Sequence, residues 1–187
     1  MPADRRARRR LLTLVGAAVP AVTMLLAVTG PGLAQAEVYL APDDFIRQAG
    51  GQPASPSFLL QRRELQQKVN AVLGHPYKAL RVRYWRSDDA TIWVLDEIGK
   101  EEDITIGFVV RAGVITSTEV LAFRETRGWE IRYPSFTRQF GGARLAEDGR
   151  LDRRIDGITG ATLSVGAYER LARLALLFDA QAGDRDR

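Results

Sequence analysis

Residues 156–164 of the chain read Asp156-Gly157-Ile158-Thr159-Gly160-Ala161-Thr162-Leu163-Ser164. They lead directly into a helical pattern that runs from Val165 to about Ala180. Small residues and hydroxyls therefore stand at the start of a helix, where free backbone N–H groups and the positive end of the helix dipole favour a phosphate. The stretch is a candidate phosphate anchor. It is also compatible with an ordinary helix start, with Thr159 or Thr162 as the N-cap and Gly160 easing the turn.

Four strand-like runs precede this stretch and are joined by short polar turns. They cover Lys78–Arg86, Thr91–Ile98, Ile104–Arg111 and Val114–Phe123. Consecutive strands with such connections predict an antiparallel meander. With helical patterns before and after it, the expected fold is an α+β domain in which helices flank the antiparallel sheet and cover one of its faces.

The segment before the meander predicts two helices separated by a loop. Val38–Leu40 fits a short strand or an extended lead, and a short helix follows from Pro42 to about Ala49, capped by Asp43 or Asp44. Gly50–Ser57 is rich in Gly, Pro and Ser and predicts a loop.

Phe58–Leu73 predicts an amphipathic helix that is ended by Gly74 and Pro76, with His75 as a turn residue. Beyond the meander, Leu151–Ile155 predicts a short strand. In the last helix, Leu171, Leu174, Leu177 and Phe178 form one apolar stripe that is typical of core packing.

Charge and composition exclude several classes of function. Five of the 27 basic residues and one of the 23 acidic residues lie in residues 1–36, so the remaining chain carries 22 of each and is formally neutral. A nucleic-acid partner is therefore not expected. With no cysteine and a single histidine, no metal site is expected either. If the protein is redox-active, its chemistry must come from an organic cofactor.

The first 36 residues have the pattern of an export signal. Residues 4–10 are nearly all charged, Leu11–Gly30 is almost wholly apolar, and Ala34-Gln35-Ala36 has the small-x-small pattern of a signal peptidase site. Cleavage is expected after Ala36. The alternative is a retained membrane anchor, because 20 residues are long enough to span a bilayer. Either alternative places the domain in the periplasm or elsewhere outside the cytoplasm.

The tetrapeptide Thr159-Gly160-Ala161-Thr162, with Asp156-Gly157 before it, resembles the [Ser/Thr]-Gly-Ala-Thr signature of the FMN-binding domain family. That family includes the covalently flavinylated subunits of sodium-translocating NADH:quinone reductase and of Rnf electron-transport complexes. The resemblance implies that Thr162 carries FMN through a phosphoester bond made by a separate flavin transferase. It also implies that Asp156 and Gly157 belong to the transferase signal. Ser164 and Thr159 are secondary candidates for the acceptor.

A second element of the same resemblance is Glu125-Thr126-Arg127-Gly128-Trp129. The family has a Glu-Thr-x-Gly element in this place, which lines the flavin pocket, although a Leu-Gly often follows where this chain has Trp129-Glu130. By resemblance, Glu125, Thr126 and Gly128 contact the isoalloxazine or its ribityl chain. Chemically, Gly128 permits a close approach of the backbone to a flat ring, and Trp129 can stack on it.

The expected organisation is a signal peptide at 1–36, an N-terminal helical segment at 37–77, an FMN-binding domain at 78–182 and a disordered tail at 183–187. The expected function is that of an extracytoplasmic electron-transfer flavoprotein with membrane redox partner proteins. It is more an electron carrier than an enzyme with its own substrate. Two alternatives stay open. One is a non-redox module that binds a phosphorylated ligand or a partner protein, and the other is a flavin-dependent reductase with its own acceptor.

Overall fold

Six antiparallel strands form one sheet in the computed structural model, in the order β1-β6-β5-β4-β3-β2. The structure describes residues 37–183, so the predicted leader at 1–36 and residues 184–187 of the predicted tail lie outside the described residues. The strands are β1 (Glu37–Val38), β2 (Ser57–Leu60), β3 (Arg81–Ser87), β4 (Ala90–Ile98), β5 (Asp103–Arg111) and β6 (Val114–Phe123). The predicted meander corresponds to β3–β6, and the α+β class is confirmed.

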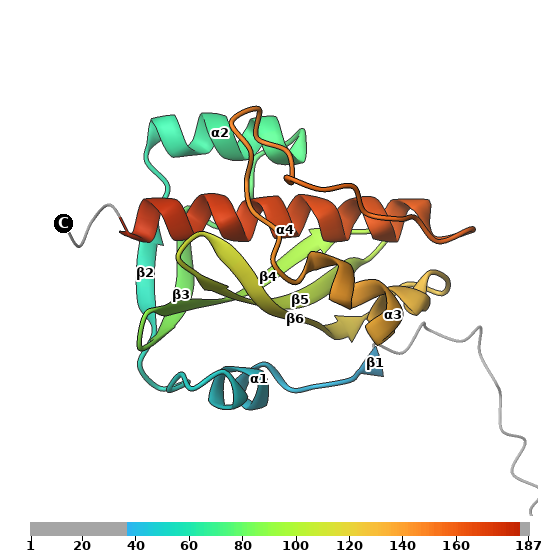
Figure 1. The fold of residues 1–187 in the computed structure, drawn as a ribbon, viewed down its shortest axis with the longest axis horizontal. Helices are drawn as coiled ribbons and strands as arrows, with labels where there is room; N and C mark the ends of the chain where they lie inside the picture. Colours follow the sequence, from blue (N-terminus) through green and yellow to red (C-terminus); the bar gives the residue numbers. More distant parts are fainter. Residues whose placement is uncertain (1–36, 184–187) are drawn as a thin grey trace, which may run out of the picture. The chain divides into compact units, whose positions relative to one another are not determined.

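The helices are α1 (Pro42–Gln48), α2 (Arg63–Leu73), α3 (Pro134–Thr137) and α4 (Thr162–Gly183), with 3-10 turns η1 (Trp129–Arg132) and η2 (Arg138–Phe140). The long helix α4 lies across one face of the sheet, and α2 lies beside it on the same face (Figure 1). The predicted apolar stripe of α4 is buried, and the Phe178 ring packs 5.5 Å from the ring of Trp93 in β4. The main core therefore lies between α4 and the sheet.

The first helix covers the opposite face of the sheet, which corrects the expectation that the helices share one face (Figure 1). Phe45 and Ile46 of α1 are buried against Trp85, Ile92 and Leu121. The sheet has apolar side chains on both faces at these positions, so a second cover is needed.

The predicted start of the second helix at Phe58 is wrong. Phe58, Leu59 and Leu60 belong to β2, where they pair with β3, and α2 begins only at Arg63. In β2 only the middle residue of the three is buried, as the period of two requires of an edge strand with one covered face. The same apolar residues fit a helical stripe equally well, so their pairing with β3 decides that they form a strand.

Two smaller expectations also need correction. Asp43 and Asp44 do not cap α1, because its N-cap is Ala41 without a side-chain hydrogen bond; both acids instead pair with Arg47. The strand expected at Leu151–Ile155 is reduced to one isolated bridge between Leu145 and Leu151. Among residues 37–183, no helix combines the length and the apolar character that crossing a membrane requires.

Candidate functional site

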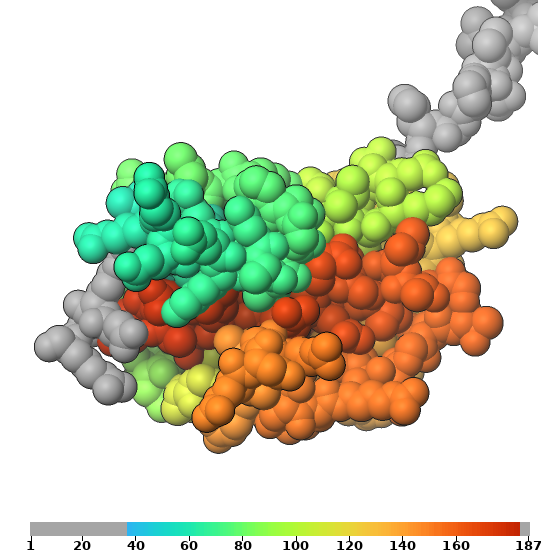
Figure 2. All heavy atoms as spheres, turned by 90° about the horizontal axis from the view of Figure 1, so that it is seen from above, coloured from blue at the N-terminus to red at the C-terminus, as the bar shows by residue number. Residues whose placement is uncertain are grey.

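A cavity of about 440 Å³ lies where the β4–β5 turn, the segment after β6 and the start of α4 meet. In Figure 2 the β4–β5 turn, in yellow-green, lies beside the start of α4. The residues that line the cavity come from these three segments: Lys100, Glu101, Glu125, Thr126, Arg127, Gly160, Ala161, Thr162, Leu163 and Ser164. Residues of both the Glu125–Trp129 and the Asp156–Ser164 sequence elements thus line one cavity.

The start of α4 presents free backbone donors to this cavity. The amide of Ala161 donates to the carbonyl of Ile158, and the first helical hydrogen bond runs from Val165 N to Ala161 O. Between them, the amides of residues 162–164 make no hydrogen bond within the described part of the chain. They stand at the positive end of a helix of 22 residues. This end of the helix is suited to bind an anion.

Gly128 packs directly on Ser164, which lies in the first turn of α4. The φ of Gly128, +91°, lies in the region that favours glycine, and a Cβ at this position would meet the Ser164 Oγ at 2.5 Å. Ser164 is only 4% exposed, and it lines the cavity. The backbone of the Glu-Thr-x-Gly element therefore lies against the Ser164 side chain at the helix start, and Ser164 in turn lines the cavity.

Glu125 organises the β4–β5 turn. A single oxygen, Oε1, accepts the amide N–H of Lys100, of Glu101 at 2.7 Å and of Glu102 at 3.0 Å. Burial acts to raise the pKa of Glu125, but the three amide donors outweigh it and hold the pKa below its usual range. Glu125 is thus an ionised carboxylate that shapes one wall of the cavity.

The structure separates the predicted site residues into two groups. Glu125, Thr126, Gly160, Ala161, Thr162 and Ser164 line the cavity, and Gly128 packs behind it. Trp129, Asp156, Gly157 and Thr159 do not line it.

These four residues have other surroundings. The Trp129 ring packs at 5.5 Å against Tyr133 instead, and the backbone of Asp156 is held by Gln139, whose Oε1 accepts the Asp156 amide N–H at 2.7 Å. Gly157 and Thr159 are exposed.

Sequence reasoning missed four lining residues: Lys100, Glu101, Arg127 and Leu163. Lys100 and Glu101 lie in a turn whose charged sequence indicates only a solvated loop, and the hydrogen bonds to Glu125 bring that turn to the cavity. Arg127 lies inside the Glu125–Trp129 element and Leu163 inside the Asp156–Ser164 stretch. Their positions beside predicted site residues could have identified them. Lys100 pairs with Glu101 at 2.7 Å, so Arg127 is the lining cation without an ion pair among residues 37–183.

The site lies in a segment that matches a known protein family. Residues 99–177 match the family model of the FMN-binding domain. This segment belongs to the FMN-binding domain family. All residues that line the cavity lie inside the matched range. A search of curated proteins finds no match.

The cavity of this FMN-binding domain has groups that fit the cofactor. Free amides at a helix N-terminus suit its phosphate, while the buried Ser164 hydroxyl and the exposed Thr126 offer hydrogen bonds to its ribityl chain or ring edge. Leu163, 54% exposed, offers an apolar surface at the same mouth. The donor set therefore suits a phosphate-bearing ligand with further polar groups.

Proposed function

We propose that the protein carries FMN covalently on Thr162, through a phosphoester, and passes electrons within a membrane-associated redox chain. The observation that carries the proposal is the position of Thr162. It is the first residue of α4, is exposed, and lines the cavity within the FMN-binding domain. Flavin supplies the redox chemistry when bound, and the chain supplies binding and electrostatics.

The three hydroxyls of the motif differ in their suitability as acceptor. Ser164 is buried against Gly128, so a bulky transferase complex cannot reach its Oγ without displacing the loop. Thr159 is exposed but precedes the helix and does not line the cavity. Thr162 alone of the three combines exposure with a place at the cavity and at the helix N-terminus, and this supports it as the acceptor.

The attachment requires an activated donor, because condensation of a phosphate monoester with an alcohol in water is unfavourable. We infer that the flavin transferase uses a flavin dinucleotide. A bond forms between Thr162 Oγ and the phosphorus on the flavin side, and the phosphoanhydride P–O bond breaks. The mononucleotide that does not carry the flavin leaves with the electron pair. The hydroxyl proton passes to a base of the transferase. The free amides of residues 162–164 stabilise the charge of the resulting phosphodiester.

The predicted leader supports a location outside the cytoplasm, cleaved or anchored. A covalent bond suits such a location, since free FMN made in the cytoplasm is not available there to refill a site. The redox partners are then membrane proteins, and the isoalloxazine is tuned by the surrounding groups alone, because the bond lies at the phosphate.

The test is the intact mass and visible absorbance of the protein exported in a host that expresses a flavin transferase. We expect a yellow protein with an added mass of FMN minus water, mapped to Thr162 by peptide analysis. Thr162→Ala should fold, but it should be colourless once it has been denatured and washed. Thr159→Ala should keep the flavin under the same treatment. A colourless wild-type protein under these conditions would instead favour the non-redox binding module. Turnover of a small acceptor faster than free FMN would favour the reductase.

A further inference from the structure

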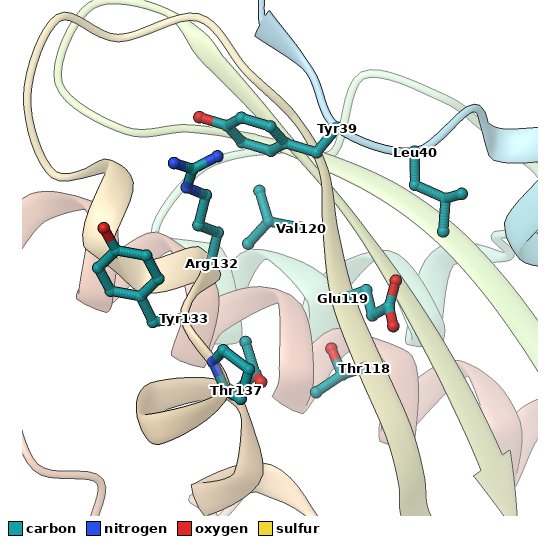
Figure 3. Close-up of a pocket in the computed structure, with 9 residues that line it drawn as sticks. Tyr39, Leu40, Thr118, Glu119, Val120, Arg132, Tyr133 and Thr137 are labelled. Carbon is teal, nitrogen blue, oxygen red and sulfur yellow. The ribbon is translucent and has the colours of Figure 1, made fainter.

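A second cavity, of about 520 Å³, lies at the outer edge of β6 and shares no lining residue with the candidate flavin cavity. Three segments form it: Tyr39 and Leu40 after β1, Thr118–Val120 of β6, and the segment from Arg132 to Thr137. Figure 3 shows these side chains around the opening. The volume is within the range of about 300–1,000 Å³ that is typical of small-molecule sites.

Arg132 is the only cation among the described residues that line this cavity. Its guanidinium lies 4.5 Å from the ring centroid of Tyr39, 5.3 Å from that of Trp129 and 5.6 Å from that of Tyr133. Within residues 37–183 it makes no ion pair or hydrogen bond, and its Nε is buried without a partner. Aromatic faces attract the positive charge but do not satisfy N–H donors in the plane of the guanidinium. An oxygen-bearing ligand would satisfy them.

The neighbouring carboxylates do not neutralise this arginine. Glu37 is engaged by Tyr39, whose hydroxyl donates to Glu37 Oε2 at 2.9 Å. Glu119 lines the cavity, but in Figure 3 it lies across strand β6 from the Arg132 guanidinium. Glu130 has a buried Oε2 with no hydrogen bond, and it forms no ion pair with Arg132 in the described part of the chain. The positive charge at this end of the cavity is therefore available to a ligand.

The rest of the wall is largely apolar or already engaged. Leu40, Val120 and Pro134 contribute hydrocarbon surface. The Thr118 hydroxyl donates to Gly107 O at 2.9 Å and lies 2.9 Å from the Tyr168 hydroxyl, so it is not free for a ligand. A matching ligand therefore has one anionic group and an apolar body.

We propose that this cavity binds a small organic carboxylate, whose carboxylate is held by Arg132 and whose apolar body lies against Leu40, Val120 and Pro134. A carboxylate is planar and singly charged, so it fits the guanidinium fork between flanking rings. A doubly charged phosphate would meet more repulsion from Glu119, which lines the cavity.

The test is isothermal titration calorimetry of the full chain with benzoate as the probe. Benzyl alcohol serves as the neutral analogue and inorganic phosphate as the other anion. We expect saturable benzoate binding and much weaker binding of both comparison compounds. Arg132→Gln should weaken benzoate binding by about tenfold or more, as expected for loss of a charge-assisted hydrogen bond. Arg138→Gln, the same change at an exposed arginine outside the cavity, should leave it within about twofold.

Arg132→Lys keeps the charge but loses the fork, so it should also bind benzoate more weakly, and it decides the matter if Arg132→Gln does not fold. Absence of saturable benzoate binding would overturn the proposal. So would equal binding of benzyl alcohol or phosphate, or benzoate binding that is unchanged in both Arg132 variants.

Discussion

Gly128 and Ser164 are in direct contact, so close that a Cβ on Gly128 would lie 2.5 Å from the Ser164 Oγ. Through this contact the loop that follows β6 is positioned on the start of α4. The shape of the candidate flavin cavity therefore depends on a glycine that does not itself line the cavity. Its role is to let the backbone of the loop approach the Ser164 side chain.

Gly128→Ala should destabilise the domain by about 1–3 kcal/mol in urea unfolding, because φ is +91° and the methyl group meets Ser164. Gly113→Ala is the matched control, since Gly113 also has a positive φ, +73°, but an added methyl group there would have no atom within 4 Å. It should cost less. Adding Ser164→Ala to Gly128→Ala should recover part of the loss. Equal costs at positions 113 and 128 would show that the contact is unimportant.

Glu125→Gln should loosen the β4–β5 turn and cost about 1–3 kcal/mol, because three amides lose a charged acceptor. The lowered pKa of Glu125 means that its contribution is present above the ordinary carboxyl pKa and is lost as pH falls through the folded-state pKa. The measurement is urea unfolding of the variant and the wild type from neutral to acidic pH. The difference between them should shrink at the acidic end.

Glu102→Gln is the control for this prediction, as its exposed side chain makes no hydrogen bond within residues 37–183. It should have little effect. A cost for Glu102→Gln equal to that for Glu125→Gln would contradict the role given to the Glu125 carboxylate.

His75 should contribute stability that depends on pH. Its Nδ1 lies 3.0 Å from the Pro76 carbonyl and its Nε2 lies 3.0 Å from the buried Glu97, and these two hydrogen bonds raise its pKa. A raised pKa makes the contribution complete below about 6.5, the ordinary value, and removes it as pH rises through the folded-state pKa. Thermal unfolding across this range should show the effect in the wild type and not in His75→Gln. Because the chain has one histidine, an identical pH profile in the variant would rule out this origin.

A fragment of residues 78–182 should not fold cooperatively, although it contains the whole range matched to the FMN-binding domain. It lacks β1 and β2, which are the two edge strands, and α2, which packs on α4. Loss of α2 exposes the surface that Leu65 and Val69 cover. Thermal unfolding followed by circular dichroism should show no sigmoidal transition for the fragment and a clear one for residues 37–187. A cooperative transition in the fragment would make 78–182 an independent domain.

Local pattern was sufficient for the middle of the fold. Alternating residues and short polar turns predicted β6 at its observed ends and β4 and β5 to within one residue, because hairpin strands with local turns depend little on distant partners. The apolar triplet at Phe58 was assigned to a helix because its pattern fits both periods. Only its pairing with β3, which follows α2 in the sequence, shows that it is a strand.

The sites show the same division. The hydroxyl and glycine residues at the start of α4 could be predicted, since a helix start and its donors are encoded within a few residues. Lys100 could not, because Glu125 brings its turn to the cavity through hydrogen bonds to backbone amides, which leave no mark on residue type. The cluster around Arg132 was also missed. Its Tyr39 ring lies far in sequence from its other two rings, Trp129 and Tyr133.

The strand order has a consequence for the timing of assembly. β1, the first strand described, pairs only with β6, the last strand of the sheet to be synthesised. Chain synthesis proceeds from the N-terminus, so Tyr39 and Leu40 must wait for β6 and then for Arg132 before their cavity exists. Contacts between such distant parts of a chain form slowly. The cavity around Arg132 therefore cannot form before Thr137 has been made, and a ligand that binds there would favour completion of the sheet edge.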